Sequence, residues 1–211
     1  MKSLAFTDDA HTKALKETYD LIAGGYAKEH EHDRWGYDVL DEMFSTVSYK
    51  GIVFDIGCGP GKECAYAYTK GYRVIGADIS PGMLEQARLR VPLVPFFSMN
   101  VLQLVFAENS LDAVIARSVL LHVPQKDVPQ ALREIRRVLV PGGRAYIAIR
   151  NGAGERMITE TYYGHTYSRF FSYFSMEEFS SLCKDAGLLI EKIRCIEPVD
   201  KDRVQYLVKK Q

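Results

Sequence analysis

A glycine-rich turn follows an acidic residue at the end of a short apolar run. The β-prone run Ile52-Val53-Phe54 ends at Asp55, and the turn continues as Ile56-Gly57-Cys58-Gly59-Pro60-Gly61. Glycines permit left-handed backbone angles and let a ligand touch the main chain without an intervening Cβ. In open parallel sheets the first strand-to-helix turn is the usual nucleotide contact, so we expect this turn to meet a ligand.

The spacing of these glycines excludes two common phosphate-binding motifs. The dinucleotide fingerprint Gly-x-Gly-x-x-Gly requires a glycine where the chain has Lys62. The phosphate loop Gly-x-x-x-x-Gly-Lys-Ser/Thr requires glycine and a hydroxyl residue where the chain has Ile56 and Glu63. A carboxylate beside a loop of backbone donors suits a ligand with an ammonium group, because a bare acid repels phosphates.

The elements that must position this turn alternate between strand and helix. Apolar β-prone runs occur at 52–54, 72–77, 96–99, 111–116 and 145–149, and helical patterns at 62–70 and 127–139, with a further helix beginning at Ser80-Pro81. A helix with a capping box at 175–178 and two strands at 189–195 and 203–209 complete the chain. This alternation predicts an α/β fold, a doubly wound and mostly parallel sheet with helices on both faces.

Two segments lie outside this alternation. Helical patterns at 7–23 and 35–47, separated by Gly24-Gly25, predict an amino-terminal helical cap over residues 1–50. Residues 51–211 form the predicted core, and the aromatic segment of about 151–174 is expected to be a loop inserted in it. A lid over the substrate and plain core packing are equally compatible with its aromatic residues.

The amino-acid composition and the net charge limit which kinds of binding partner are expected. Hydrophobic residues make up 47% and charged residues 26% of the 211 residues, as in ordinary globular proteins. Lys plus Arg and Asp plus Glu both number 27, so no net charge favours a polyanion. The four cysteines form no Cys-x-x-Cys pair, no long apolar run occurs, and Met1-Lys2-Ser3 lacks the layout of a signal peptide. We therefore expect a cytoplasmic protein without a membrane or nucleic-acid partner.

The motifs together resemble one family, the class I S-adenosylmethionine-dependent methyltransferases, and in particular its small-molecule branch with short chains. The resemblance covers about residues 17–211 and rests on the order and spacing of Val53–Gly61, Val74–Ser80, Asn109–Val114, Leu120–His122 and Leu132–Gly143. It implies a Rossmann-like methyltransferase fold with a seven-stranded sheet and an antiparallel last strand. It also implies S-adenosylmethionine as cofactor and S-adenosylhomocysteine as product.

The same resemblance assigns roles around the cofactor. Asp55 would bind the amino group of the methionine moiety, directly or through water, and Asp78 would accept both ribose hydroxyls. Asn100 and Val101 would meet the adenine edge, although the family more often has Asp where Asn100 stands. Further residues would contribute backbone approach, adenine packing, the methyl end and an aromatic closure: Gly57, Cys58 and Gly59; Ile79 and Met83; Ala116 and Arg117; Tyr19 and Tyr26.

Methyl transfer from a sulfonium is a direct displacement, so alignment and exclusion of water are the main requirements. Proximity and orientation alone can supply on the order of 7 to 11 kcal/mol. A phenol or alcohol acceptor would also need a base, for which His122, His165 and tyrosines of the aromatic segment are the candidates. His122 lies in an apolar stretch, where a histidine is more often structural. The cluster His30-Glu31-His32 predicts solvated surface and no metal site, because alternate residues face apart on a helix.

The expected function is methyl transfer to a small-molecule acceptor of unspecified identity. An RNA methyltransferase is one alternative, because Arg169–Glu178 is similar to a segment of family members that act on wobble uridines of transfer RNA. The balanced charge opposes that alternative. A catalytically silent cofactor-binding domain is the other, and turnover on any acceptor would exclude it. The sequence leaves the oligomeric state open.

Overall fold

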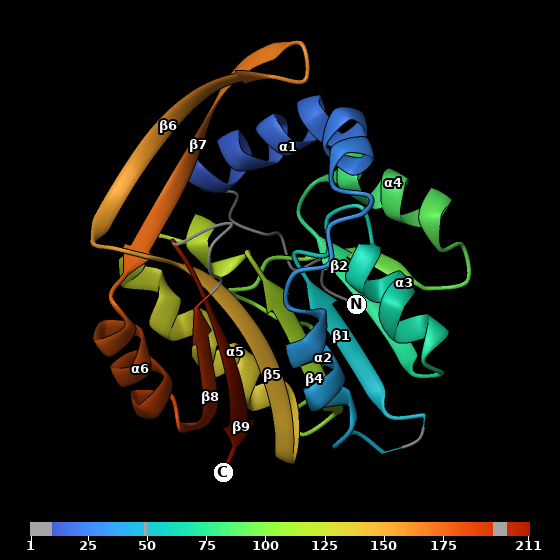
Figure 1. Ribbon diagram of the computed structural model, residues 1–211, viewed down its shortest axis with the longest axis vertical. Coiled ribbons are helices and arrows are strands. Elements are labelled where there is room, and N and C mark those ends of the chain that lie inside the picture. The colour runs from blue at the N-terminus through green and yellow to red at the C-terminus, as the bar shows by residue number, and fades with distance from the viewer. Residues whose placement is uncertain (1–9, 49, 196–201) are drawn as a thin grey trace.

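A central sheet forms the middle of the computed structural model, which describes residues 10–48, 50–195 and 202–211. Seven strands follow the order β3-β2-β1-β4-β5-β9-β8 (Figure 1). Their bounds are β1 Ile52–Ile56, β2 Arg73–Asp78, β3 Phe96–Ser98, β4 Leu111–Arg117, β5 Leu139–Asn151, β8 Leu188–Cys195 and β9 Arg203–Lys210. Strands β1 to β5 pair in parallel, and β9 is antiparallel to β5. The expected fold class is confirmed.

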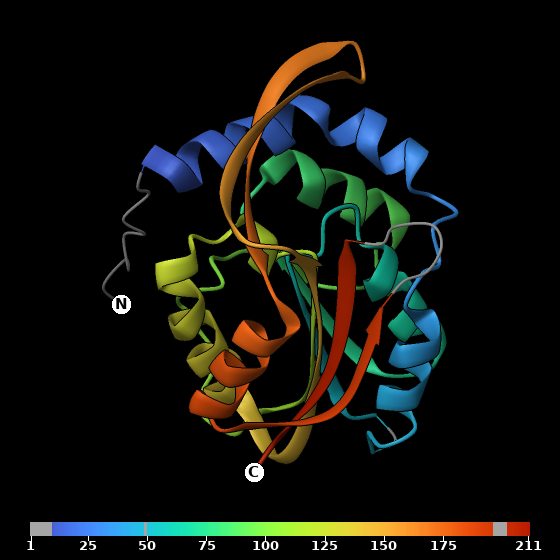
Figure 2. The same cartoon turned by 60° about the vertical axis from the view of Figure 1, so that its left-hand side comes forward.

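Helices cover both faces of this sheet, as Figure 2 shows. One face packs against α2 (Tyr37–Phe44), α3 (Lys62–Thr69) and α4 (Pro81–Arg90), and the other against α5 (Val128–Val138) and α6 (Met176–Asp185). Helix α5 has its apolar residues at helical spacing, and all of them are buried against the sheet: Val128, Ala131, Leu132, Ile135 and Val138. The two apolar layers therefore fix the sheet so that the carboxyl ends of β1, β2 and β4 lie together at the same end of the sheet.

Helix α1 (Ala10–Glu29) lies across the carboxyl ends of the strands (Figures 1 and 2). The expected break at Gly24-Gly25 is wrong, because the helix continues through both glycines. A Cβ on Gly25 would lie 2.7 Å from the Tyr163 ring, whereas one on Gly24 would meet nothing within 4 Å. Gly25 therefore serves a close approach between α1 and the segment that contains Tyr163.

That segment is a β-hairpin and not the expected loop. Strands β6 (Gly154–Tyr162) and β7 (His165–Phe174) pair antiparallel and extend the sheet to nine strands in the described residues. The two residues between them, Tyr163 and Gly164, both have positive φ angles, as a tight two-residue hairpin turn requires. In β7 the residues Tyr167, Phe171 and Tyr173 are buried and lie on one face. Their spacing in multiples of two residues is typical of a strand, and the prediction of a loop did not take it into account.

The hairpin joins the core at the end of β5, where Arg150 pairs with Tyr173 and Asn151 with Phe174. It then passes over α1, as Figure 2 shows. Helix α1 and the hairpin thus enclose a space above the strand ends. In the described part of the chain, no helix is long and apolar enough to span a membrane.

Candidate cofactor and acceptor site

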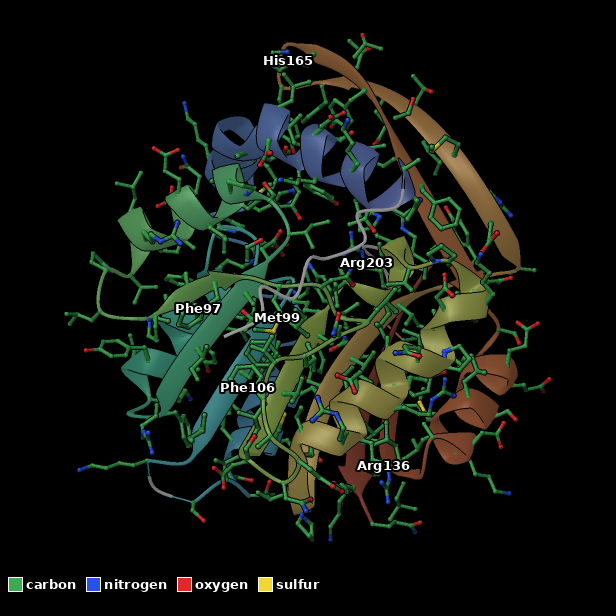
Figure 3. All side chains as sticks on the ribbon, turned by 180° about the vertical axis from the view of Figure 1, so that it is seen from behind. Phe97, Met99, Phe106, Arg136, His165 and Arg203 are labelled. Carbon is green, nitrogen blue, oxygen red and sulfur yellow. The ribbon has the colours of Figure 1, made fainter. Side chains whose placement is uncertain are left out.

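A cavity of about 230 Å³ lies between the carboxyl ends of the strands, α1 and the hairpin. Most of the residues expected from the sequence line it: Tyr19, Tyr26, Gly57, Gly59, Asp78, Ile79, Met83, Asn100, Val101, Arg117 and His122. In Figure 3 the lining residues Met99 and Arg203 lie below α1, near the strand ends. The topology thus brings residues from distant parts of the chain into one enclosure, at the edge where open parallel sheets bind ligands.

Asp78 ends β2 and is held rigidly by backbone donors. Its Oδ2 accepts a hydrogen bond from Gly59 N at 2.9 Å, and its Oδ1 accepts one from Ser80 N at 2.9 Å. The side chain is only 8% exposed, and burial raises the pKa of its carboxyl group against the opposing effect of these hydrogen bonds. Each oxygen retains a lone pair on the cavity side. The carboxylate is therefore preorganised to accept two further donors.

The glycine turn leaves room beside Asp78. Gly57 and Gly59 have positive φ angles of 69° and 49°, and a Cβ on Gly59 would meet nothing within 4 Å. Gly59 therefore faces open space. Backbone atoms of this turn are consequently accessible to a ligand whose hydroxyl groups reach Asp78, as the ribose of S-adenosylmethionine requires.

Apolar and amide groups complete this end. Ile79 and Met83 line the cavity, and Met83 is buried where helix α4 begins, with its N–H donating to the Ser80 hydroxyl at 3.0 Å. Asn100 accepts a hydrogen bond from Leu102 N at its Oδ1 at 2.9 Å, which fixes the orientation of the amide. These residues form an apolar slot with one oriented amide, and such a slot fits a purine.

The opposite end of the cavity contains a tyrosine–histidine pair. The His122 ring nitrogen Nδ1 lies 2.7 Å from the Phe170 carbonyl oxygen, which only accepts, so Nδ1 carries the proton. Burial, opposed by this hydrogen bond and reinforced by Arg169 and Arg150, lowers the pKa of His122 to about 3. The neutral ring then has a bare Nε2, which accepts from the Tyr19 hydroxyl at 2.6 Å. Burial raises the pKa of Tyr19, so its proton stays on oxygen.

Arg117, at the end of β4, is fixed by three neighbours. It forms ion pairs with Glu63 and, at 3.3 Å, with Asp33, and its guanidinium lies 3.6 Å from the centre of the Trp35 ring. The Arg203 guanidinium lies 4.8 Å from the same ring centre. Arg117 is thereby held at the cavity wall between the two ends.

Four expected site residues are not among the described residues that line the cavity. The Asp55 carboxyl group is 1% exposed, accepts from the Cys64 thiol at 3.3 Å and has its pKa raised by burial and by nearby Glu63. It lies beneath the turn, so its position gives no support to a direct contact with a ligand.

The other three are also displaced from the cavity for identifiable reasons. The Cys58 N–H donates to the Ala77 carbonyl at 2.9 Å and its thiol packs in the core, while the Ala116 methyl group faces the opposite apolar layer. His165 is exposed beside the hairpin turn, at the tip seen in Figure 3. His165 is not among the described residues that line the cavity, so its position gives no support to a role as base.

The sequence analysis missed several lining residues. Arg150, Arg169 and Phe171 come from β5 and β7, His11 from α1 and Arg203 from β9. The spacing of Tyr167, Arg169, Phe171 and Tyr173 at every second residue was the sequence signal for a strand that places these side chains on one face. His30, expected on solvated surface, also lines the cavity, with its ring centre 4.2 Å from that of Tyr26. His30 is still 33% exposed, because α1 ends at Glu29 and places it at the cavity rim, and Glu31 and His32 are exposed as expected.

Comparison with known proteins identifies the family. Residues 54–147 match the family model described as a methyltransferase domain. The chain is 36% identical over 193 residues to methyltransferase GfsG of Streptomyces halstedii, covering 87% of this chain and 66% of that protein. It is 37% identical over 147 residues to demethylmenaquinone methyltransferase of Symbiobacterium thermophilum, covering 62% and 56%. The chain thus spans about two thirds or less of the length of these relatives.

A solved structure shows the same fold. The 1,6-didemethyltoxoflavin-N1-methyltransferase of Burkholderia thailandensis, with bound 1,6-didemethyltoxoflavin and S-adenosylhomocysteine, superposes with a TM-score of 0.74 at 18% identity, covering 95% of this chain and 89% of that one. Fold, motif order and relatives agree with the expectation from the sequence. The chain belongs to the class I S-adenosylmethionine-dependent methyltransferases.

Proposed function

We propose that the protein transfers a methyl group from S-adenosylmethionine to a small-molecule acceptor by direct displacement. The observation that carries this proposal is a cavity with a preorganised carboxylate, Asp78, at one end and the Tyr19–His122 pair at the other. Named relatives support a small acceptor, since demethylmenaquinone and 1,6-didemethyltoxoflavin are small molecules.

The residues at the Asp78 end would hold the cofactor. Asp78 accepts the two ribose hydroxyls, Ile79 and Met83 pack on the adenine, and Asn100 meets its edge. Gly57 and Gly59 let the backbone approach. When bound, S-adenosylmethionine supplies an electrophilic methyl group on a sulfonium. The carboxylate suits this ligand better than a pyrophosphate cofactor, because it attracts hydroxyl donors and repels phosphates.

His122 acts in this proposal by positioning and not as the general base. Its pKa of about 3 leaves the ring neutral at pH 7 but weakly basic, whereas an effective base has a pKa near the working pH. Its Nε2 instead fixes the Tyr19 hydroxyl. The hydroxyl oxygen accepts from Arg169 Nη1 at 3.4 Å and keeps one further lone pair for a hydrogen bond from the methyl acceptor. The pair thus orients the acceptor behind the methyl group, and alignment supplies the main part of the rate.

Helix α1 and the hairpin act as the lid that excludes water. Thr18 of α1 donates to the Ser168 carbonyl of β7 at 3.3 Å, and Gly25 allows Tyr163 to pack on the helix. In this proposal residues 1–50 are a cap, and residues 51–211 are the core with the inserted segment of about 151–174. The lid role follows from the lining residues that both segments contribute.

The first test is ligand binding. S-adenosylmethionine and S-adenosylhomocysteine should raise the melting temperature, since a ligand at 100 times its dissociation constant adds about 2.7 kcal/mol. NADH and ATP should not. Absence of a shift with both sulfur ligands, or a larger shift with NADH, would contradict the proposal.

The second test identifies the acceptor class. The protein is incubated with methyl-labelled S-adenosylmethionine and a cell extract, which is then separated into RNA, protein and small-molecule fractions. We expect the label in the small-molecule fraction. Label in the RNA fraction would replace this proposal with the RNA methyltransferase, and no transfer to any fraction would favour a silent cofactor-binding domain.

A further inference from the structure

An arginine without a carboxylate partner lies in the wall of the acceptor half of the cavity. Arg150 lies near the end of β5, and none of the described residues places a carboxylate oxygen within the 4.0 Å of an ion pair. Toward the described residues its five N–H donors make one long hydrogen bond, from Nη1 to the Tyr173 hydroxyl at 3.4 Å, and its buried Nε–H meets no acceptor among them. Arg150 is partly buried and lines the cavity, so its free N–H donors are available to an anion that enters there.

A second guanidinium lies against the same aromatic ring. The Arg150 guanidinium carbon is 4.6 Å from the centre of the Phe171 ring, and that of Arg169 is 5.2 Å from it. Arg169 is paired with Glu160, and its Nη1 faces the Tyr19 hydroxyl at 3.4 Å. Two cations therefore share one ring beside the Tyr19–His122 pair, although only one of them has a carboxylate to balance it.

The ring and the cations define what would fit between them. The Phe171 ring provides an apolar surface next to the His122 ring, whose centre is 4.8 Å away. The planar guanidinium fork matches the two oxygens of a carboxylate and binds them with parallel hydrogen bonds. Strands β5 and β7 supply this site, whereas Asp78 of the cofactor site ends β2, so different elements position the two groups.

We propose that Arg150, with Arg169 beside it, binds a carboxylate group of the methyl acceptor, so that the substrate is a small acid with an apolar or aromatic body. This inference rests on the proposed function for the position of the cofactor. Arg150 is a substrate-binding residue in it, and Phe171 supports the apolar body. A neutral analogue of the same shape leaves Arg150 without a carboxylate partner and binds weakly.

Benzoate and benzamide are the probes, because they share shape and differ in charge. Binding is measured by calorimetry on the protein saturated with S-adenosylhomocysteine. Benzoate should bind at least tenfold more tightly than benzamide. Arg150→Gln should lower the affinity for benzoate at least tenfold and leave the affinity for S-adenosylhomocysteine unchanged. Arg150→Lys should retain part of the affinity for benzoate.

Arg156→Gln is the matched control. Arg156 also stacks on an aromatic ring, 4.6 Å from the centre of Tyr173, but it is exposed on β6 and is not among the described lining residues. This variant should bind benzoate as the parent does. If Arg150→Gln fails to fold, the ratio of the benzoate affinity to the benzamide affinity of the parent protein still tests whether the site prefers a carboxylate.

Three results would overturn the inference. They are equal binding of the two probes, unchanged benzoate binding by folded Arg150→Gln, and a loss of S-adenosylhomocysteine affinity in that variant, which would make Arg150 a cofactor ligand. Failure of the parent to bind S-adenosylhomocysteine contradicts the proposed function instead. The comparison of probes is then repeated without it, so the two failures are distinguishable.

Discussion

Replacing Asp78 with asparagine tests the cofactor end with the smallest change of shape. The two Asp78 oxygens accept from Gly59 N and Ser80 N, so the NH2 group introduced by Asp78→Asn would have to face one of these N–H donors. Because asparagine is neutral, both hydrogen bonds to the ribose would lose the contribution of the carboxylate charge, and the one at the NH2 group would lose its acceptor. A charge-assisted hydrogen bond contributes about 1.5 to 3 kcal/mol, and each 1.4 kcal/mol is tenfold in affinity. Asp78→Asn should therefore bind S-adenosylhomocysteine roughly 10- to 100-fold more weakly.

Calorimetry with S-adenosylhomocysteine measures this loss, and circular dichroism verifies the fold. Asp127→Asn is the matched control, because Asp127 lines the same cavity but belongs to η2 (Gln125–Asp127) at the other end. Its affinity should equal that of the parent. Parent-like affinity in folded Asp78→Asn would refute the assignment of this carboxylate to the ribose.

The pH dependence follows from the same carboxylate. Burial raises the pKa of Asp78 in the empty site, and two hydroxyl donors favour its ionised form. Affinity should therefore decrease as the pH falls through this raised pKa, above the ordinary range of an aspartate. Asp78→Asn should abolish that decrease, which titration calorimetry at several pH values would show.

Three further predictions concern α1 and the tyrosine–histidine pair. Tyr19→Phe leaves the buried His122 Nε2 without its donor and should lower the free energy of unfolding, measured in urea, by about 1 to 3 kcal/mol. Tyr26→Phe is the control and should change this free energy little, because no described residue forms a hydrogen bond with the Tyr26 hydroxyl. Gly24→Ala should raise stability by up to about 1 kcal/mol through helix propensity, while Gly25→Ala should lower the melting temperature by forcing the hairpin from the helix. The pKa of His122 is about 3 in the folded protein and about 6.5 in the unfolded chain. The free energy of unfolding should therefore fall by about 1.4 kcal/mol per pH unit as the pH decreases from 6.5. His122→Gln should not show this loss of stability.

The sequence predicted the part of the site that depends on local backbone geometry. A strand, a glycine turn and a second strand ending in an acid place Gly57, Gly59 and Asp78 together in any doubly wound sheet, so their spacing sufficed. It did not indicate that Asp55 and Cys58, which belong to the same segment of sequence, lie outside the described cavity lining. The direction of a side chain at a strand end depends on packing from the other layer, and a motif does not contain that information.

The acceptor half was beyond prediction because its geometry is nonlocal. Arg150 and Phe171 meet only because the hairpin pairs with the end of β5, a contact between segments that sequence patterns describe separately. The helix break predicted at Gly24-Gly25 was wrong for a related reason. In the sequence, a glycine that leaves room for a neighbouring ring cannot be distinguished from a glycine that ends a helix. Tertiary contact, and not propensity, decided these elements.

Two adjacent residues of α1 connect the two ends of the cavity. Asp20 Oδ1 accepts from the Ser80 hydroxyl at 2.6 Å and from Gly82 N at 2.9 Å, which fixes α1 to the helix that follows Asp78. Tyr19, the preceding residue, bonds to His122 in the acceptor half. Because one turn of helix makes both contacts, a displacement of α1 that opens the acceptor end also strains the support of the cofactor end. The contact of this helix with the hairpin in turn depends on Gly25.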